Sequence, residues 1–384
     1  MTPSNPFFAL LIILITFCTG YIINLKYKLK VSPNRFETID GLRGFLAVSV
    51  FIHHSNIWYT YVQTGNWASP DSNLFNQLGH TSVSLFFMIS SFLFVKMLMD
   101  FKGENYDWKS FFVRRIFRLA PLHFCITTII IVIVFIQSNW ELNVSYTTLT
   151  KNLIQWYGFG TLGLGPINDF RATIINAGVL WSLPYEWLLY FCLPLISILI
   201  LKSKPKLFYI LLGVIFIIIS LQFRSYRFVH LLSFLGGAIA PIILKYSKKS
   251  INYNNWWFTI LLLFSMILVF QFYSSNNYIC KLFIIISFTL IALGNTFFGL
   301  LKNTTLKLLG EISYSTYLIH GVLLFVTVHY IYGLEQTKLL SQTDYCLLIL
   351  MMSPFLIIIS FLTYLFIEKP FMARAKRITM TTIR

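Results

Sequence analysis

The chain has 384 residues, of which 57% are hydrophobic, 18% aromatic and only 11% charged, and its formal net charge is +17. This composition excludes a water-soluble globular domain and indicates a membrane protein with several spans. The Lys and Arg residues cluster in short segments between apolar runs, as the positive-inside rule requires, so no nucleic-acid partner is expected.

Hydropathy predicts an all-α polytopic membrane helix bundle of about eleven transmembrane helices. The expected spans are 7–25, 44–61, 81–99, 119–136, 179–201, 207–223, 228–244, 256–272, 282–301, 312–332 and 345–367. No Lys or Arg precedes the first run and no cleavage pattern follows it, so we expect a helix that is retained rather than a signal peptide.

The distribution of positive charge predicts the orientation. With the N-terminus outside and the C-terminus in the cytoplasm, 24 of the 30 Lys and Arg lie on the cytoplasmic side. The six that fall outside are Lys151, Arg171, Arg224, Arg227, Lys281 and Lys338. We therefore expect a multi-pass protein of the inner (plasma) membrane. The five cysteines show neither pairing nor ligand spacing, and no metal site is expected.

The second span carries the first candidate site. It opens with Asp40-Gly-Leu-Arg43, which we expect to be a charged loop, and runs into an apolar helix that contains His53 and His54. Arg43 and His54 are eleven residues apart, so a helix places them within about 20° of each other and about 16 Å apart along its axis, whereas His53 points elsewhere. An ionisable group inside a membrane favours a catalytic site, and a histidine bonded to a neighbouring helix is the alternative.

Three arginines, Arg114, Arg115 and Arg118, precede the fourth span. Guanidinium groups suit phosphate oxygens, so these residues are candidates for binding a phosphorylated donor on the cytoplasmic side. The alternative is that they only set the topology.

Two further spans carry polar groups on one face. In the fifth span Glu186 follows Ser182 and precedes Tyr190, and this buried carboxylate either orients a catalytic group or holds helices together. In the tenth span Tyr317 and His320 share a face, where they either contact the donor or join neighbouring helices.

Two connections are long, 62–80 and 137–178. The second contains a glycine-rich stretch, 157–165, which is either a lid over an acceptor or a flexible linker.

Six motifs, in this order, resemble those of the acyltransferase 3 family of membrane acyltransferases. They are Asp40-Gly-Leu-Arg43 with His54, Ser84 to Leu93, Arg115-x-x-Arg118, Trp181-Ser-Leu-x-x-Glu186, Ser313-Tyr-x-x-Tyr317-Leu-x-His320 and Glu368-Lys-Pro-Phe371. Ser91 departs from the glycine usual in the second motif, and the span 7–25 is additional.

The resemblance implies a ten-helix core with one extra N-terminal helix, divided as 1–34, an acyltransferase domain at 35–371 and a basic cytoplasmic tail at 372–384. It implies acetyl transfer from cytoplasmic acetyl-CoA to a hydroxyl of a cell-surface glycan, such as lipopolysaccharide O-antigen, capsule or exopolysaccharide, or of its lipid-linked precursor. His54 would be the catalytic imidazole with Arg43 close by.

The residues and the resemblance together predict a membrane O-acyltransferase. His54, Arg43 and Glu186 are the expected catalytic residues, and donor binding is expected from Arg114, Arg115, Arg118, Tyr317 and His320. His54 acts either as general base or as carrier of the acyl group. The alternative function is a transporter or flippase of a glycolipid, because intramembrane His, Glu and Arg also line substrate paths. The sequence predicts neither the acceptor sugar nor the oligomeric state.

Overall fold

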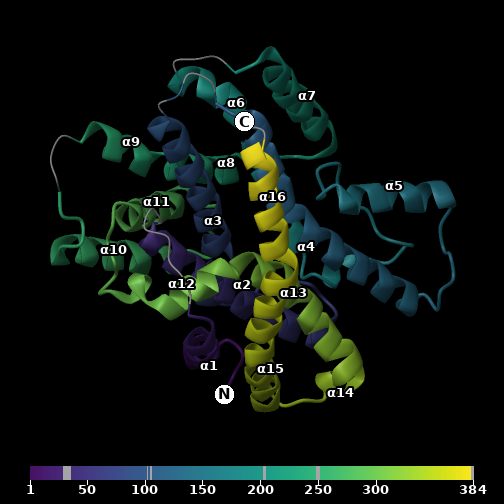
Figure 1. The fold of residues 1–384 in the computed structure, drawn as a ribbon. Coiled ribbons are helices and arrows are strands. Elements are labelled where there is room, and N and C mark those ends of the chain that lie inside the picture. The colour runs from purple at the N-terminus through teal and green to yellow at the C-terminus, as the bar shows by residue number, and fades with distance from the viewer. Residues whose placement is uncertain (29–35, 102, 104–105, 202–204, 248–250, 382–384) are drawn as a thin grey trace. The chain divides into compact units, whose positions relative to one another are not determined.

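Figure 1 shows the computed structural model, which describes residues 1–28, 36–101, 103, 106–201, 205–247 and 251–381. The described chain is helical apart from turns, loops and one isolated β-bridge between Ile167 and Phe170, which confirms the all-α class. The expected boundary between 1–34 and 35–371 lies outside the described residues. So do the expected cytoplasmic cations Lys30, Arg35, Lys102, Lys202, Lys204, Lys248, Lys249 and Arg384.

The chain divides into two compact units. Unit 1 comprises residues 1–96 and 227–360, and unit 2 comprises residues 97–226 and 361–384. Each unit is therefore built from two separate stretches of sequence. Hydropathy did not predict this division, because it detects spans but not the contacts between them.

Unit 1 is built around α2 (Glu37–Thr64), which packs against α1 (Pro6–Tyr27), α11 (Tyr278–Ala292), α12 (Thr304–Glu311) and α13 (Ser313–Val326). The other helices of this unit are α3 (Asn73–Asp100), α8 (Phe228–Gly237), α9 (Ile239–Tyr246), α10 (Trp256–Val269), η3 (Leu300–Lys302), the π-helix η4 (Thr327–Ile331), α14 (Leu334–Lys338) and α15 (Gln342–Thr363). The ends of α3 and α15 continue into unit 2.

Unit 2 contains the longest helix, α4 (Trp108–Gln137), which packs against α5 (Tyr146–Tyr157) and the C-terminal helix α16 (Lys369–Thr381). Its other helices are η1 (Ala172–Ile174), η2 (Val179–Ser182), α6 (Leu183–Ile200), α7 (Leu207–Phe223) and the π-helix η5 (Tyr364–Glu368).

Polar caps begin many of these helices. An Asn, Ser or Asp side chain accepts a hydrogen bond from a backbone N–H of the first turn, where no helical partner exists. These caps are Asn5, Asp107, Ser145, Asn255, Asn277 and Asn303.

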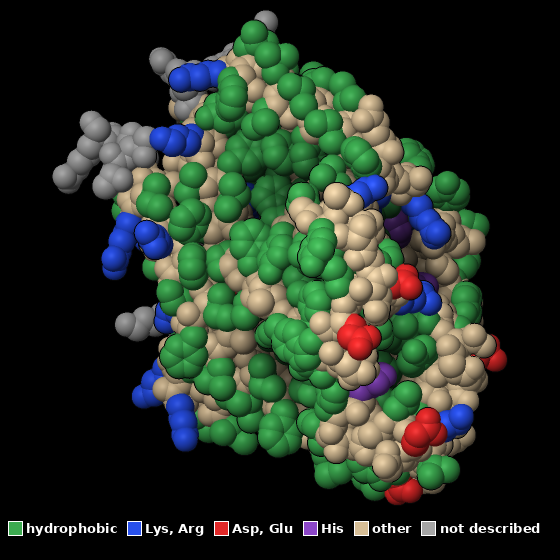
Figure 2. Space-filling view, turned by 90° about the vertical axis from the view of Figure 1, so that its right-hand side faces the viewer, with side chains coloured by type: hydrophobic (Ala, Val, Ile, Leu, Met, Phe, Trp, Pro, Cys, Tyr) green, Lys and Arg blue, Asp and Glu red, His purple; other side chains and the backbone are tan. Residues whose placement is uncertain are grey.

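Seven stretches of helix in the described chain are long and apolar enough to cross a membrane, and three shorter apolar helices, α7, α10 and α11, accompany them. All eleven expected spans fall on helices, although 228–244 is divided between α8 and α9 and 282–301 is regularly helical only to Ala292. The span 44–61 lies within α2, which is 28 residues long but too polar to be one of the seven. Figure 2 shows hydrophobic side chains over most of the face in view, as expected of a surface that meets lipid.

One expectation about connections is wrong. The connection 62–80 is short, because α2 continues to Thr64 and α3 begins at Asn73. The connection 137–178 is long, as expected, and it contains the helix α5. Residues 372–381 of the expected tail are helical, as part of α16.

Candidate active site

Four histidines lie together in unit 1. The rings of His53 and His54 on α2 have centroids 4.9 Å apart, and His80 on α3 lies 5.5 Å from His53. On the other side, His320 on α13 stacks on His54 at 5.0 Å. The row runs from His80 through His53 and His54 to His320, and the sequence analysis did not include His80.

The hydrogen bonds of His320 determine how His54 is protonated. The Nδ1 atom of His320 lies 3.1 Å from the carbonyl oxygen of Thr316, and because a carbonyl only accepts, this Nδ1 carries the proton. The Nε2 atom of a neutral His320 is then an acceptor, and it lies 3.0 Å from Nδ1 of His54. Nδ1 of His54 therefore donates, to this Nε2 and toward the carbonyl oxygen of Val50 at 3.0 Å.

The tautomer of His54 follows from these hydrogen bonds. With its proton on Nδ1, a neutral His54 keeps the lone pair on Nε2. This atom can take a proton from a hydroxyl group or attack a carbonyl carbon. His54 is the half-buried member of the pair, whereas His320 is fully buried.

Close packing against α12 fixes the position of α2. A Cβ atom added at Gly310 of α12 would overlap the carbonyl oxygen of Asp40, and one added at Gly44 would overlap the carbonyl oxygen of Leu306. The two backbones can approach this closely only because both positions are glycine. The segment from Asp40 to Arg43 lies inside α2, so the expected charged loop is wrong.

Arg43 and His54 lie on one uninterrupted helix, as expected. Arg43 is half-buried, eleven residues before His54. The buried ring of Tyr317 lies 6.1 Å from the ring of His320, one turn earlier on α13. Unit 1 therefore brings together His54, Tyr317 and His320 from two packed helices, whereas Arg43 lies about three turns before His54 on α2.

The surroundings of His53 are those of a packing residue. Its Nδ1 lies 2.8 Å from the carbonyl oxygen of Phe75, and its ring packs so closely on Gly79 that a Cβ there would overlap it. Although His53 is adjacent to His54, it serves to hold α2 against α3.

Unit 2 holds the remaining candidates in a second polar cluster. The hydroxyl of Tyr190 donates to the carboxylate of Glu186 one turn before it on α6. Arg115 of α4 lies close enough to interact with Tyr190, Glu186 and Arg118, and its guanidinium group lies 5.8 Å from the ring centre of Phe111. Glu186 is thus brought together with the arginines.

Arg114 differs from the other two arginines. It is exposed on α4, whereas Arg115 and Arg118 are half-buried. The structure therefore groups two of the three predicted arginines with Glu186 and leaves Arg114 on the surface.

The glycine-rich stretch 157–165 is tied to the body of unit 2. The indole of Trp156 donates to the carbonyl oxygen of Gly165 at 2.8 Å. The side-chain amide of Gln155 donates to the carbonyl oxygen of Leu162 at 3.0 Å. Arg224 donates to the carbonyl oxygen of Gly160 at 2.9 Å. These bonds favour an ordered, packed segment over either a lid or a flexible linker.

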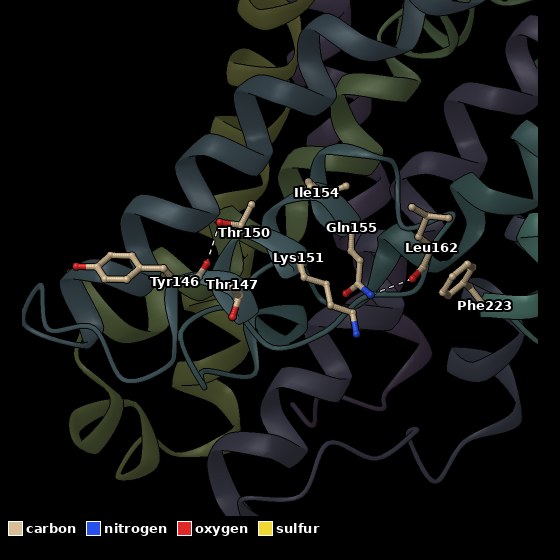
Figure 3. A pocket seen from close by; sticks show the side chains of 8 residues that line it. All are labelled: Tyr146, Thr147, Thr150, Lys151, Ile154, Gln155, Leu162 and Phe223. Carbon is tan, nitrogen blue, oxygen red and sulfur yellow. Dashed lines mark hydrogen bonds between the residues drawn. The ribbon is translucent and has the colours of Figure 1, made fainter.

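Each unit also contains a cavity. In unit 2 a cavity of about 560 Å³ lies along α5, with Lys151, Gln155 and the end of α7 at Phe223 around it (Figure 3). In unit 1 an apolar cavity of about 80 Å³ lies beside α2 at Leu46 and Ser49. Neither cavity is lined by a predicted catalytic residue.

Residues 36–366 match the acyltransferase domain of the acyltransferase 3 family. The Bacillus subtilis (strain 168) protein YrhL, provisionally named a peptidoglycan O-acetyltransferase, is 28% identical over 178 residues, which are 44% of this chain and 25% of YrhL. The peptidoglycan O-acetyltransferase OatA of Listeria monocytogenes serovar 1/2a (strain ATCC BAA-679 / EGD-e) is 25% identical over 191 residues, which are 48% of this chain and 28% of OatA.

The alignments thus span about a quarter of the length of each curated relative. No solved structure matches the chain. The matched region contains every predicted site residue, and α1 lies before it. With a helical membrane architecture and a match over residues 36–366, the chain belongs to the acyltransferase 3 family.

Proposed function

We propose that this protein is a membrane O-acyltransferase that moves an acetyl group from cytoplasmic acetyl-CoA to a hydroxyl of a cell-surface glycan or of its lipid-linked precursor. The observation that carries the proposal is the tautomer of His54, whose Nε2 lone pair is kept available by the hydrogen bond from its Nδ1 to His320. The names of the relatives support acetyl as the acyl group and a glycan as the acceptor.

The chemistry requires one base. Nε2 of His54 takes the proton of the acceptor hydroxyl as its oxygen attacks the thioester carbonyl, and the proton then passes to the departing CoA thiolate. His320 acts as a positioning residue, because it accepts the Nδ1 proton of His54 and holds the ring in one tautomer. In the alternative order, Nε2 first attacks the thioester and takes the acetyl group, and the CoA thiolate departs. The hydroxyl oxygen then attacks the acetyl carbonyl, and its proton passes to Nε2 as the imidazole leaves.

The donor is held by charge. Arg115 and Arg118 are proposed to bind the CoA phosphates, since guanidinium groups form paired, charge-assisted hydrogen bonds with phosphate. Glu186 is proposed to orient Arg115 rather than to act on the substrate, because both groups belong to one network with Tyr190. The orientation predicted from the charge distribution, with the N-terminus outside, supports this role, because these arginines would then lie on the side where acetyl-CoA is found.

The direct test is thioester turnover by the purified full chain in detergent. Release of CoA from acetyl-CoA, measured with a thiol reagent in the presence of oligosaccharides from the producing cell, should require His54. Mass analysis of surface glycans from a deletion strain would identify the acetylated sugar. Loss of glycolipid translocation in that strain, without any acetyl-CoA turnover by the protein, would favour a flippase.

A further inference from the structure

Two lysines in the described part of unit 1 are buried, and their surroundings differ. Lys307 of α12 is 6% exposed, and its Nζ lies 2.7 Å from a carboxylate oxygen of Glu37. Lys281 of α11 is 1% exposed, and its Nζ donates to two hydroxyl oxygens, of Ser84 at 2.7 Å and of Ser233 at 3.2 Å. Within the described chain, Lys281 makes no ion pair.

A buried ammonium group without a counter-charge is costly. Hydroxyl groups replace part of the hydration of the ammonium group, but they do not neutralise its charge. Membrane proteins keep such groups mainly where they serve a ligand or a transport path. The charge of Lys281 is therefore better explained by an anion that is bound during function than by packing alone.

The hydrogen bonds around Lys281 leave donors for such an anion. Ser84 donates to the carbonyl oxygen of His80 at 3.0 Å, so its hydroxyl proton is used, and Ser275 lies 3.3 Å from the same Ser84 oxygen. The third N–H of Lys281 and the hydroxyl proton of Ser233 have no acceptor among the described residues. The Nδ1 atom of His80 is likewise buried without a hydrogen-bond partner there. Three donor positions thus lie on α11, α8 and α3.

The approach to this cluster is also cationic. His230 lies one turn after Arg227, near both Arg227 and Lys281, and it is half-buried whereas Arg227 is exposed. Arg227 and Lys281 are two of the six cations that the charge distribution assigns to the external side. An anion entering from that side would meet the exposed guanidinium group of Arg227 before the buried ammonium group of Lys281.

The cluster adjoins the row of histidines that contains His54. His80 lies near Lys281. The ring centroids of His80 and His53 are 5.5 Å apart, and those of His53 and His54 are 4.9 Å apart. A group bound at Lys281 would therefore be held at one end of the row that contains the proposed base.

We propose that Lys281, Ser233 and His80 form a binding site for one carboxylate or phosphate group of the acyl acceptor, so that the preferred acceptor is an acidic glycan. The site would hold the acceptor by its charge while a hydroxyl of the same molecule reaches His54. This proposal rests on the proposed acyltransferase function for its biological meaning, but the anion site can be tested without turnover.

The first experiment measures binding alone. Thermal stabilisation of the purified full chain in detergent is followed with D-glucuronate, glucose 6-phosphate and D-glucose as probes. The two anionic sugars, but not glucose, should stabilise the protein, and the stronger of the two identifies the group as carboxylate or phosphate. Lys281→Met should weaken the binding of that sugar about tenfold or more, since hydrogen bonds to charged groups are the strong ones.

Three variants make the result decisive. Lys338→Met removes an exposed cation from the same predicted side and should leave binding unchanged, and Ser233→Ala replaces Lys281→Met if the latter does not fold. His54→Ala should still bind the anionic sugar. Binding that survives both Lys281→Met and Ser233→Ala, or equal stabilisation by glucose, overturns the proposal.

Turnover is measured separately. With acetyl-CoA as donor, Lys281→Met should raise the KM for an acidic acceptor and leave both the KM for acetyl-CoA and the rate on a neutral acceptor unchanged. A matching rise in the KM for acetyl-CoA would assign Lys281 to the donor and overturn the proposal. If the wild type binds anionic sugars but transfers no acetyl group, the proposed function fails while the anion site stands.

Discussion

The two units contain polar clusters of opposite chemical character. Unit 1 brings together imidazoles that hydrogen bond to one another and to backbone carbonyls, as between His54 and His320. Unit 2 brings together permanently charged groups, Arg115 and Arg118, with the carboxylate of Glu186. The first arrangement suits proton transfer, which needs a neutral base with one free lone pair, and the second suits the binding of a charged ligand.

From this difference we expect the cluster of unit 1 to act in the transfer reaction and the cluster of unit 2 to bind the donor. A substitution in the imidazole cluster of unit 1 should affect the rate of transfer, whereas one in the guanidinium cluster of unit 2 should affect donor affinity. The predictions below test whether the two effects can in fact be separated.

The largest effect is expected from His54→Ala. Without the imidazole no group is placed to take the hydroxyl proton, so the rate of acyl transfer should fall by a factor of about 10² to 10⁴, while the protein still inserts and binds CoA. Transfer is measured at matched protein levels in membranes. His53→Ala is the control, because His53 packs against α3 and should keep substantial activity per folded molecule. Near-wild-type turnover by His54→Ala would remove the imidazole from the mechanism.

A smaller loss of rate is expected from His320→Leu. This change removes one of the two acceptors of the Nδ1 proton of His54 and leaves only the carbonyl oxygen of Val50. Part of the population should then adopt the other tautomer, which has no lone pair on Nε2. In metal sites, outer partners that orient a histidine are worth about 10- to 100-fold, and a fall in kcat of that size is expected here. The KM for acetyl-CoA should not change. A changed KM with constant kcat would instead make His320 a donor-binding residue, as the sequence analysis expected.

The double substitution Arg115→Lys with Arg118→Lys tests unit 2. Lysine keeps the charge but lacks the planar pair of donors, so affinity for CoA should fall by about tenfold or more. Binding is measured directly with labelled CoA in the His54→Ala background, so that turnover does not interfere. Arg114→Lys is the matched control, since Arg114 is exposed on the same helix and should be nearly neutral. Equal affinity in all three proteins would leave only the topological role.

The smallest effect concerns the ion pair between Glu37 and Lys307 at the start of α2. Its hydrogen bond to Lys307 lowers the pKa of Glu37 below the usual value of 4.5. The pair therefore stabilises the fold above about pH 4.5, and this contribution disappears as the pH falls through the lowered pKa. Because Glu37 is 39% exposed, less than about 1 kcal/mol is expected.

Thermal unfolding of the wild type and of Glu37→Gln should accordingly differ slightly at pH 7 and converge near pH 3. A difference that persists at pH 3 would mean that Glu37 contributes through packing rather than through its charge. Lys307 differs in this respect from Lys281, which is also buried in unit 1 but donates only to hydroxyl groups among the described residues.

Much of the helical framework could be predicted from the sequence. The eleven apolar runs all lie on helices, because each run is long enough to require internal hydrogen bonds in lipid and nothing else satisfies them. The polar segments were less predictable. The stretch from Asp40 to Arg43 reads as a loop, yet it is helical because α12 packs closely against it at Gly310. The amphipathic helix α5 was missed because no hydrophobic span marks it.

By itself, the sequence determined the candidate residues. The spacing of Arg43 and His54, the pair Arg115 and Arg118, and the position of Glu186 within an apolar run are each a local pattern within a single helix. Only the tertiary structure decided how these residues are combined. The pairing of His54 with His320 spans 266 positions, and that of Lys281 with Ser84 spans 197. Helical periodicity determines which face of a helix a side chain occupies, but the partner on that face depends on the packing of distant helices, which no local pattern encodes.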